Sequence, residues 1–309
     1  HDGPHAARRE FVINEDYALI SNNLVYGAMA AYTIAMFAFA ASFAQSRSVE
    51  DTVVSGRKAG NIAMSVSWVG TILLLGGLIF RGLAATRAPW GNMYEFSLAA
   101  TLGVMGVFLV TSLKRNVRWL GIFVVLPVLL WLGLAITVLY TEAAELIPAL
   151  KSYWLLIHVT AAIISAGVFI LGASIVTLQL LISRAEKLQA AGKPATRYLW
   201  LQKRVPDSAT LDLFAYKVHA FSFPLWTFTV VAGAIWARSA WGRYWGWDPK
   251  ETWSFITWVG YAAYLHARVT NGWKGDKAAW LALAAFATFI FNYFLVNFFF
   301  VGLHSYAGT

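Results

Sequence analysis

Cysteine is missing from all 309 residues of the chain. Its absence excludes disulfide bonds, CxxC redox chemistry, metal sites built on thiolates, and covalent attachment of haem to this chain through a CxxCH motif. Charge is scarce as well, because Asp, Glu, Lys and Arg make up 13% of the residues, against about 25% in soluble domains. With 59% hydrophobic residues, the chain lacks the polar surface of a water-soluble protein.

The N-terminal residues lack the pattern of a cleavable signal peptide. Residues 1–15 are polar, and no small-residue cleavage site follows an apolar core there. We therefore expect His1 and His5 to lie in a polar tail without a functional role.

Long apolar stretches are abundant, and eight of them reach the length of about 20 residues that crosses a bilayer as a helix. They lie at 22–43, 63–85, 94–113, 120–140, 153–182, 214–236, 251–269 and 278–302. No repeat or soluble domain interrupts them, so residues 1–309 are predicted to form a single membrane domain. The predicted fold is all-α, a polytopic helix bundle of about eight transmembrane helices. The longest polar connection, 183–212, predicts a short helix near 184–191.

The Lys and Arg residues predict how these helices are oriented. The loops after the first, third, fifth and seventh predicted helices hold 16 of the 24 Lys and Arg residues, and the other loops and tails hold 8. Because basic residues collect in cytoplasmic loops, we expect both termini and the loop 237–250 to be extracytoplasmic. The net charge of +9 then reflects topology and indicates no nucleic-acid partner.

One of the extracytoplasmic loops is rich in tryptophan. Residues 239–253 read SAWGRYWGWDPKETW, and residues 236–253 carry the large aromatics Trp236, Trp241, Tyr244, Trp245, Trp247 and Trp253. Aromatic anchoring of helices at the membrane surface is the plainer explanation. Gly242 and Gly246 allow tight turns and close approach of a ligand. The loop, closed by Asp248 and Pro249, therefore favours a platform for a planar hydrophobic ligand.

Two histidines flank this loop at the same predicted depth. His158 lies near the start of the fifth predicted helix, and His304 ends the eighth, on the same side of the membrane. A single helical histidine is more often a packing residue, and we keep that interpretation for His219, at the inner end of the sixth predicted helix. For His158 and His304 the shared depth favours iron ligation, because neutral imidazole is the common axial ligand of haem.

A fourth histidine is predicted to lie deep in the membrane. His266 is 15 residues into the seventh predicted helix, which places it about 22 Å below the outer surface. An ionisable residue at that depth is a candidate for function, and we expect no second histidine of this chain there. The widely spaced histidines that hold haems along one helix in di-haem cytochrome b bundles are absent, which disfavours a quinone-linked electron carrier.

A second extracytoplasmic loop, 87–95, reads RAPWGNMYE. Arg81 and Arg87 are cations that suit carboxylates such as the propionates of haem. A plain turn with interfacial Trp90 and Tyr94 explains the same loop equally well.

The segment 241–251, W-G-x-x-W-x-W-D-P-K-E, resembles the WWD signature of haem-handling membrane proteins. The segment Tyr264-Leu265-His266-Ala267-Arg268 and the ending Gly302-Leu303-His304-Ser305-Tyr306 resemble the CcsA (ResC) family of system II cytochrome c biogenesis. The resemblance is strong from residue 211 to the C-terminus and looser at 89–95 and His158. The number of helices and the C-terminal position of the motif favour CcsA over the shorter CcmC and the longer CcmF of system I.

This resemblance implies a membrane subunit of a system II cytochrome c synthase, in the plasma (inner) membrane or the thylakoid membrane. Haem b, held without covalent bonds, would cross the membrane to an extracytoplasmic or lumenal site and be attached to the CxxCH motif of apocytochrome c. His158 and His304 would ligate its iron there, and His266 would share a membrane haem with a histidine of the partner Ccs1 (ResB). The residues expected to contact haem are Trp236, Trp241, Trp245, Trp247, Asp248, Arg81 and Arg87.

Two other functions stay open at this point. A haem transporter or chaperone of the CcmC kind would deliver haem without catalysing its attachment, and we would expect a shorter bundle without His266. A structural scaffold would bind no ligand. We expect the chain to contribute positioning and iron ligation, because only Asp248 and Glu251 offer acid–base groups near the loop.

Overall fold

The computed structural model describes residues 14–46, 57–143 and 152–304, which contain helices and no strands. The long helices are α1 (Glu15–Gln45), α3 (Arg57–Ala84), α4 (Met93–Lys114), α5 (Gly121–Thr137), α6 (Tyr153–Ala190), α8 (Ser208–Trp241), α9 (Pro249–Val269) and α10 (Asp276–Tyr293). Three short helices accompany them: η1 (Arg118–Leu120), α7 (Thr196–Gln202) and α11 (Leu295–Phe299). The prediction of an all-α fold is confirmed.

Each of the eight predicted spans falls on a helix, but only seven helical segments of the described chain are both long and apolar enough to cross a membrane. The exception is α9, which has 21 residues. Its Trp, Tyr, Ser and Thr side chains make it less apolar than the other segments. The count of about eight transmembrane helices therefore overestimates what length and apolar character alone support.

Several helix ends differ from the predicted spans. Helix α6 continues to Ala190 and includes the short helix predicted at 184–191, and α8 begins at Ser208, where the side chain of Asp207 caps it. Apolar runs mark only the part of a helix in the membrane, so polar extensions escape them. The last predicted span was wrong at its end, because α10 stops at Tyr293, α11 stops at Phe299, and His304 follows in a turn.

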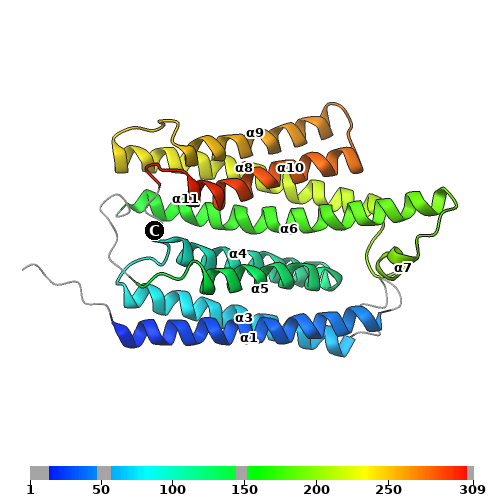
Figure 1. The fold of residues 1–309 in the computed structure, drawn as a ribbon, viewed down its shortest axis with the longest axis horizontal. Helices are drawn as coiled ribbons and strands as arrows, with labels where there is room; N and C mark the ends of the chain where they lie inside the picture. The colour runs from blue at the N-terminus through cyan, green and yellow to red at the C-terminus, as the bar shows by residue number, and fades with distance from the viewer. Residues whose placement is uncertain (1–13, 47–56, 144–151, 305–309) are drawn as a thin grey trace, which may run out of the picture.

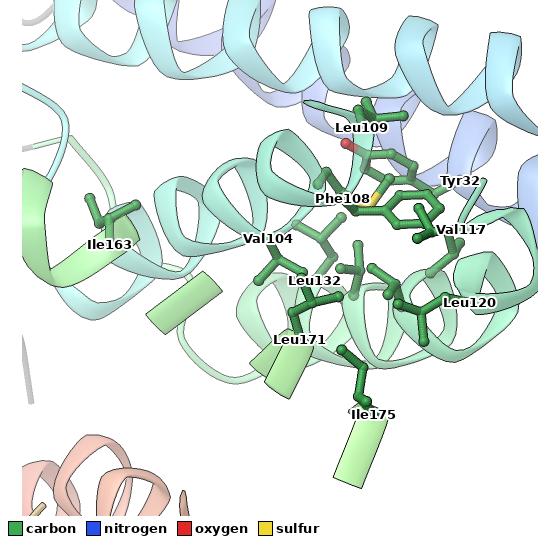
Figure 2. Close-up of a cluster of buried hydrophobic side chains, with 14 of the residues drawn as sticks. Tyr32, Val104, Phe108, Leu109, Val117, Leu120, Leu132, Ile163, Leu171 and Ile175 are labelled. Atoms are coloured by element: carbon green, nitrogen blue, oxygen red, sulfur yellow. The ribbon is translucent and has the colours of Figure 1, made fainter. Parts of the chain in front are cut away.

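The helices form two layers, with α1, α3, α4 and α5 in one and α6, α8, α9 and α10 in the other (Figure 1). Figure 2 shows buried side chains where the layers meet, among them Phe108 of α4, Leu132 of α5 and Leu171 of α6. Small residues bring α4 and α6 together: a Cβ atom on Gly167 would lie 2.9 Å from the carbonyl carbon of Gly103. Such close backbone approach is typical of helix packing in membranes.

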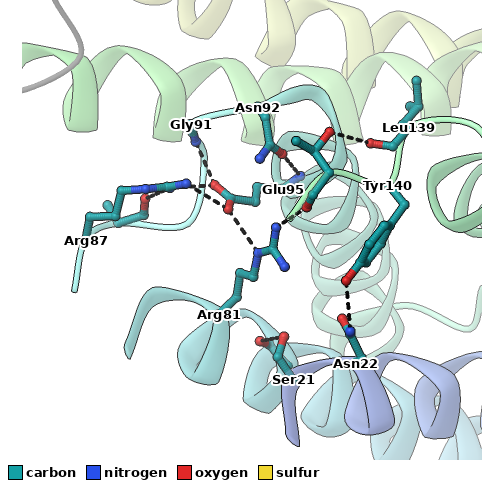
Figure 3. A network of polar contacts seen from close by, with 12 residues as sticks. Ser21, Asn22, Arg81, Arg87, Gly91, Asn92, Glu95, Leu139 and Tyr140 are labelled. Atoms are coloured by element: carbon teal, nitrogen blue, oxygen red, sulfur yellow. Dashed lines mark hydrogen bonds and ion pairs between the residues drawn. The ribbon is translucent and has the colours of Figure 1, made fainter. Parts of the chain in front are cut away.

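A buried carboxylate joins α3, α4 and the chain after α5 (Figure 3). Glu95 of α4 accepts hydrogen bonds from Arg81 Nε at 3.0 Å and from Arg87 Nη1 at 2.6 Å. Arg81 is 1% exposed and also donates to the carbonyl oxygen of Thr141. The backbone N–H of Gly91 donates to Glu95 as well, at 2.8 Å. Glu95 thus fixes the loop before α4 against its neighbours.

We expect Glu95→Ala to lower the free energy of unfolding by about 3–5 kcal/mol, because it leaves a buried guanidinium without its carboxylate. Thermal unfolding of the detergent-solubilised protein measures the effect. Glu142→Ala is the matched control, because Glu142 is an exposed carboxylate just after Thr141, and it should leave stability unchanged. Equal stability of the two variants would contradict the role of Glu95.

Candidate functional site

A pocket lies at the end of the bundle where α6 and α9 begin and α8 and α10 end. These helix ends are on the left in Figure 1, opposite α7. The pocket is mostly apolar and aromatic, and it contains both histidines that the sequence singled out. Its lining includes His158, His304, Trp226, Trp236, Tyr244 and Trp245.

His158, the sixth residue of α6, is held by α8. Its Nδ1 donates a hydrogen bond to the carbonyl oxygen of Thr229 at 2.9 Å, and its ring stacks on Trp236 with 5.9 Å between the centroids. Gly233 makes room for the ring, since a Cβ there would lie 2.7 Å from His158 Cε1. Because a carbonyl oxygen only accepts, the proton sits on Nδ1, and the lone pair of this neutral imidazole is on Nε2.

His304 is held by Asp248. Its Nδ1 donates to Asp248 Oδ2 at 2.7 Å, and its ring lies 5.6 Å from Trp236 and 4.8 Å from Trp241, measured between centroids. Nε2 is therefore the nitrogen that would ligate a metal. A carboxylate behind a ligating imidazole fixes the tautomer and increases the basicity of the ligand.

Asp248 is fixed by its place in the chain, because it is the N-cap of α9 and forms a capping box with Glu251. Its carboxylate accepts the backbone N–H of Leu303 at 2.6 Å and of Lys250 at 3.2 Å. Partial burial raises the pKa of Asp248, but the hydrogen bonds from His304, Leu303 and Lys250 outweigh burial and hold that pKa below its usual value. Asp248 therefore stays an anion behind His304.

The structure separates the tryptophans of the predicted platform. Trp236 and Trp245 line the pocket, while Trp241 packs edge-on against Trp236 at 4.8 Å. Trp247 is 67% exposed, with φ at 58°, a left-handed conformation that is uncommon for a large side chain. Only part of the loop therefore faces a ligand in the pocket.

The cation that lines the pocket is not one of the two arginines that the sequence suggested. Arg81 and Arg87 bind Glu95 and do not line the pocket, whereas Lys250 does. The sequence analysis did not predict Lys250 as a residue of the pocket wall, although Lys250 lies inside the motif at 241–251. Its position two residues after Asp248, at the start of α9, was the available signal.

The two remaining described histidines differ in burial: His219 of α8 packs against the inner face of α9, and His266 lies on the outer face of α9. His219 is 1% exposed, and its ring lies 5.2 Å from that of Tyr264 on α9. His266 is exposed, and it is two residues beyond Tyr264, about 200° around the helix. Because α8 begins at Ser208, His219 is well inside α8. The expectation that no second histidine reaches the level of His266 was therefore wrong, but His219 faces the bundle interior and His266 faces outward.

Comparisons with known proteins match most of the chain to a known family. Residues 90–304 match the family described as "Cytochrome C assembly protein". Curated relatives named "Cytochrome c biogenesis protein CcsA" include that of Guillardia theta, 38% identical over 71% of this chain and 76% of its own. The Porphyra purpurea protein of the same name is 32% identical over 93% of this chain and 98% of its own.

The fold also resembles a solved structure, "Cytochrome c Heme Lyase CcmF", with a TM-score of 0.60 and 17% sequence identity. The match covers 90% of this chain and 47% of that one, so the chain spans about half the length of CcmF. Together with the seven apolar helices, these comparisons make the chain an integral membrane protein with a role in cytochrome c maturation. It belongs to the CcsA family of cytochrome c biogenesis proteins.

Proposed function

We propose that this chain is the membrane subunit of a system II cytochrome c synthase. It moves haem across the membrane and presents it at an extracytoplasmic or lumenal site for thioether attachment to the CxxCH motif of apocytochrome c. The observation that carries the proposal is the meeting of His158 and His304 in one tryptophan-lined pocket.

The donor set of the pocket fits haem b. Two neutral imidazoles suit the two axial positions of haem iron, and each imidazole here has its Nδ1 on an oxygen acceptor. The ligating nitrogen is then Nε2 in both rings. Indole and apolar side chains suit the faces of a porphyrin. Because the chain contains no cysteine, haem binds it without thioether bonds.

The contribution of the chain to the attachment reaction is positioning. Haem is the substrate, and the cysteine thiols of the apocytochrome add across the double bonds of its vinyl groups to form thioethers. His158 is anchored in a helix and His304 on a cap residue, so both rings are oriented before haem arrives. Such preorganisation lowers the entropic cost of bringing the reacting groups together. The exposed indole of Trp247 offers the apocytochrome a surface beside the pocket.

The proposed route through the membrane uses His266 and a second polypeptide. His266 is exposed on α9, and its Nδ1 lies 3.4 Å from the hydroxyl of Thr270. An imidazole that faces outward from a membrane bundle is costly unless another protein covers it. We assign the covering surface to Ccs1 (ResB), which supplies the opposite ligand of a membrane haem.

His158→Ala and His304→Ala should each abolish cytochrome c maturation, because haem iron loses one axial ligand. Added imidazole should restore part of the activity by filling the vacant position. Covalent haem staining of a co-expressed CxxCH cytochrome measures maturation. His219→Gln is the control, because it removes a histidine ring that lies outside the pocket. This variant should mature cytochrome normally.

Full maturation by either alanine variant without imidazole would exclude bis-histidine ligation. Haem that binds the unaltered complex but is never attached to the cytochrome would favour the alternative function, a haem chaperone.

Asp248→Asn should raise the reduction potential of the bound haem, because a neutral acceptor makes His304 a weaker donor to ferric iron. Loss of such a supporting carboxylate also lowers metal affinity by about 10–100-fold. Spectroelectrochemical titration gives the potential, and absorbance titration gives the affinity. Asp207→Asn, a change of the same kind at the cap of α8, should alter neither value. An unshifted potential in Asp248→Asn would refute the supporting role of Asp248.

His266→Ala should lower the haem content of the complex co-expressed with Ccs1 (ResB), because the pocket is supplied through the membrane site. The pocket itself is untouched, so haem added to the purified complex should bind with unaltered affinity. Val259→Ala, at another exposed position of α9, is the control and should keep full haem content. Unchanged haem content in His266→Ala would mean that the route lies elsewhere.

A further inference from the structure

Lys250 is a half-buried cation whose hydrogen-bond partners are neutral groups. Its Nζ donates to the carbonyl oxygen of Asn292 at 2.9 Å and to Oδ1 of Asn297 at 2.9 Å, and it lies 5.8 Å from the ring centroid of Tyr293. Among the described residues, no carboxylate forms an ion pair with it. An ammonium group has three N–H donors, so these two acceptors leave capacity for one more.

The break between α10 and α11 creates this arrangement. Helix α10 ends at Tyr293 and α11 begins at Leu295, and the last carbonyl groups of a helix lack intrahelical donors. Asn292 offers such a carbonyl, and Asn297 follows from α11. Both acceptors belong to the wall of the pocket, so Nζ is held where a ligand of the pocket would lie.

Neither nearby carboxylate accepts a hydrogen bond from Lys250 Nζ, although Glu251 Oε1 has no hydrogen-bond partner. Glu251 Oε2 accepts the backbone N–H groups of Gly246 at 2.8 Å and Asp248 at 3.1 Å. Asp248 accepts from Leu303 and His304. An ammonium in a low-dielectric site gains most from an anion that arrives with the ligand.

Lys250 is also the one Lys or Arg among the described residues that line the pocket. The arginines that the sequence suggested for this role are bound by Glu95 outside it. Haem is an apolar disc that carries two carboxylates on one edge, so a pocket for it needs a cation near an apolar, aromatic wall. Lys250 meets that requirement.

We propose that Lys250 binds a propionate carboxylate of haem and thereby sets which edge of the porphyrin enters the pocket. The inference rests on the proposed function, because it needs haem as the ligand. It assigns to Lys250 the role of recognising the acidic edge, and to the two histidines the role of recognising iron. The opposite edge, with the vinyl groups, is then directed away from Lys250.

The test compares haem with its dimethyl ester, in which both carboxylates are neutral. The purified, haem-stripped complex is titrated with each porphyrin, and the Soret absorbance gives the dissociation constants. The unaltered protein should bind haem at least about 10-fold more tightly than the diester, as expected for a charge-assisted hydrogen bond. Lys250→Met should bind both with nearly equal affinity, by losing affinity for haem and keeping that for the diester.

Lys250→Gln is a second neutral variant whose amide still donates to Asn292 or Asn297, and it should lose the preference for haem in the same way. Binding of the diester with unaltered affinity shows that each variant keeps its pocket. Lys187→Met is the control, because Lys187 is 66% exposed and pairs with Asp276 away from the pocket. It should keep the full preference.

Each failure has a distinct meaning. A preference for haem that persists in Lys250→Met and Lys250→Gln, or that is missing from the unaltered protein, overturns the inference and leaves the proposed function intact. If the unaltered complex binds neither porphyrin, the proposed function fails and the inference fails with it.

Discussion

The arrangement of the site depends on the hydrogen bonds of one carboxylate, that of Asp248. It caps α9 and accepts hydrogen bonds from the N–H of Leu303 and from Nδ1 of His304. One side chain therefore connects the tryptophan-rich loop, the start of α9 and the non-helical segment after α11. The segment brings His304 into the same pocket as His158, because this carboxylate holds the segment against the bundle. The same carboxylate therefore begins a helix and orients the ring of His304.

Two sets of ion pairs hold charged side chains inside the described bundle. Glu95 neutralises Arg81 and Arg87, and Asp212 accepts two hydrogen bonds from Arg268 at 2.6 and 2.7 Å. These ion pairs join helices and satisfy one another, which is the usual condition for charge in an apolar medium. Half-buried Lys250 differs from them, because its hydrogen-bond partners are neutral. The difference separates charges that join helices from a charge that lines the pocket.

Much of the fold follows from apolar length alone, and each of the eight predicted spans overlaps a helix. The site could be predicted from the sequence less completely than the fold. His158 and His304 could be paired from their predicted depth, but the sequence did not indicate that Arg81 and Arg87 meet Glu95, since that requires the packing of α3 against α4. Nor did it indicate the break after Tyr293, because residues 278–302 are mostly apolar and contain no proline. Tertiary contacts decide both features.

Gly302 illustrates how tightly the segment after α11 lies against the cap of α9. A Cβ atom at this position would fall 2.5 Å from Asp248 Oδ1, which is too close for a carbon atom. The same oxygen accepts the N–H of Leu303, with 2.6 Å between nitrogen and oxygen. Any larger residue at 302 would push the segment away from the carboxylate. The cap of α9 therefore restricts position 302 to glycine, because a side chain there would displace the carboxylate that orients His304.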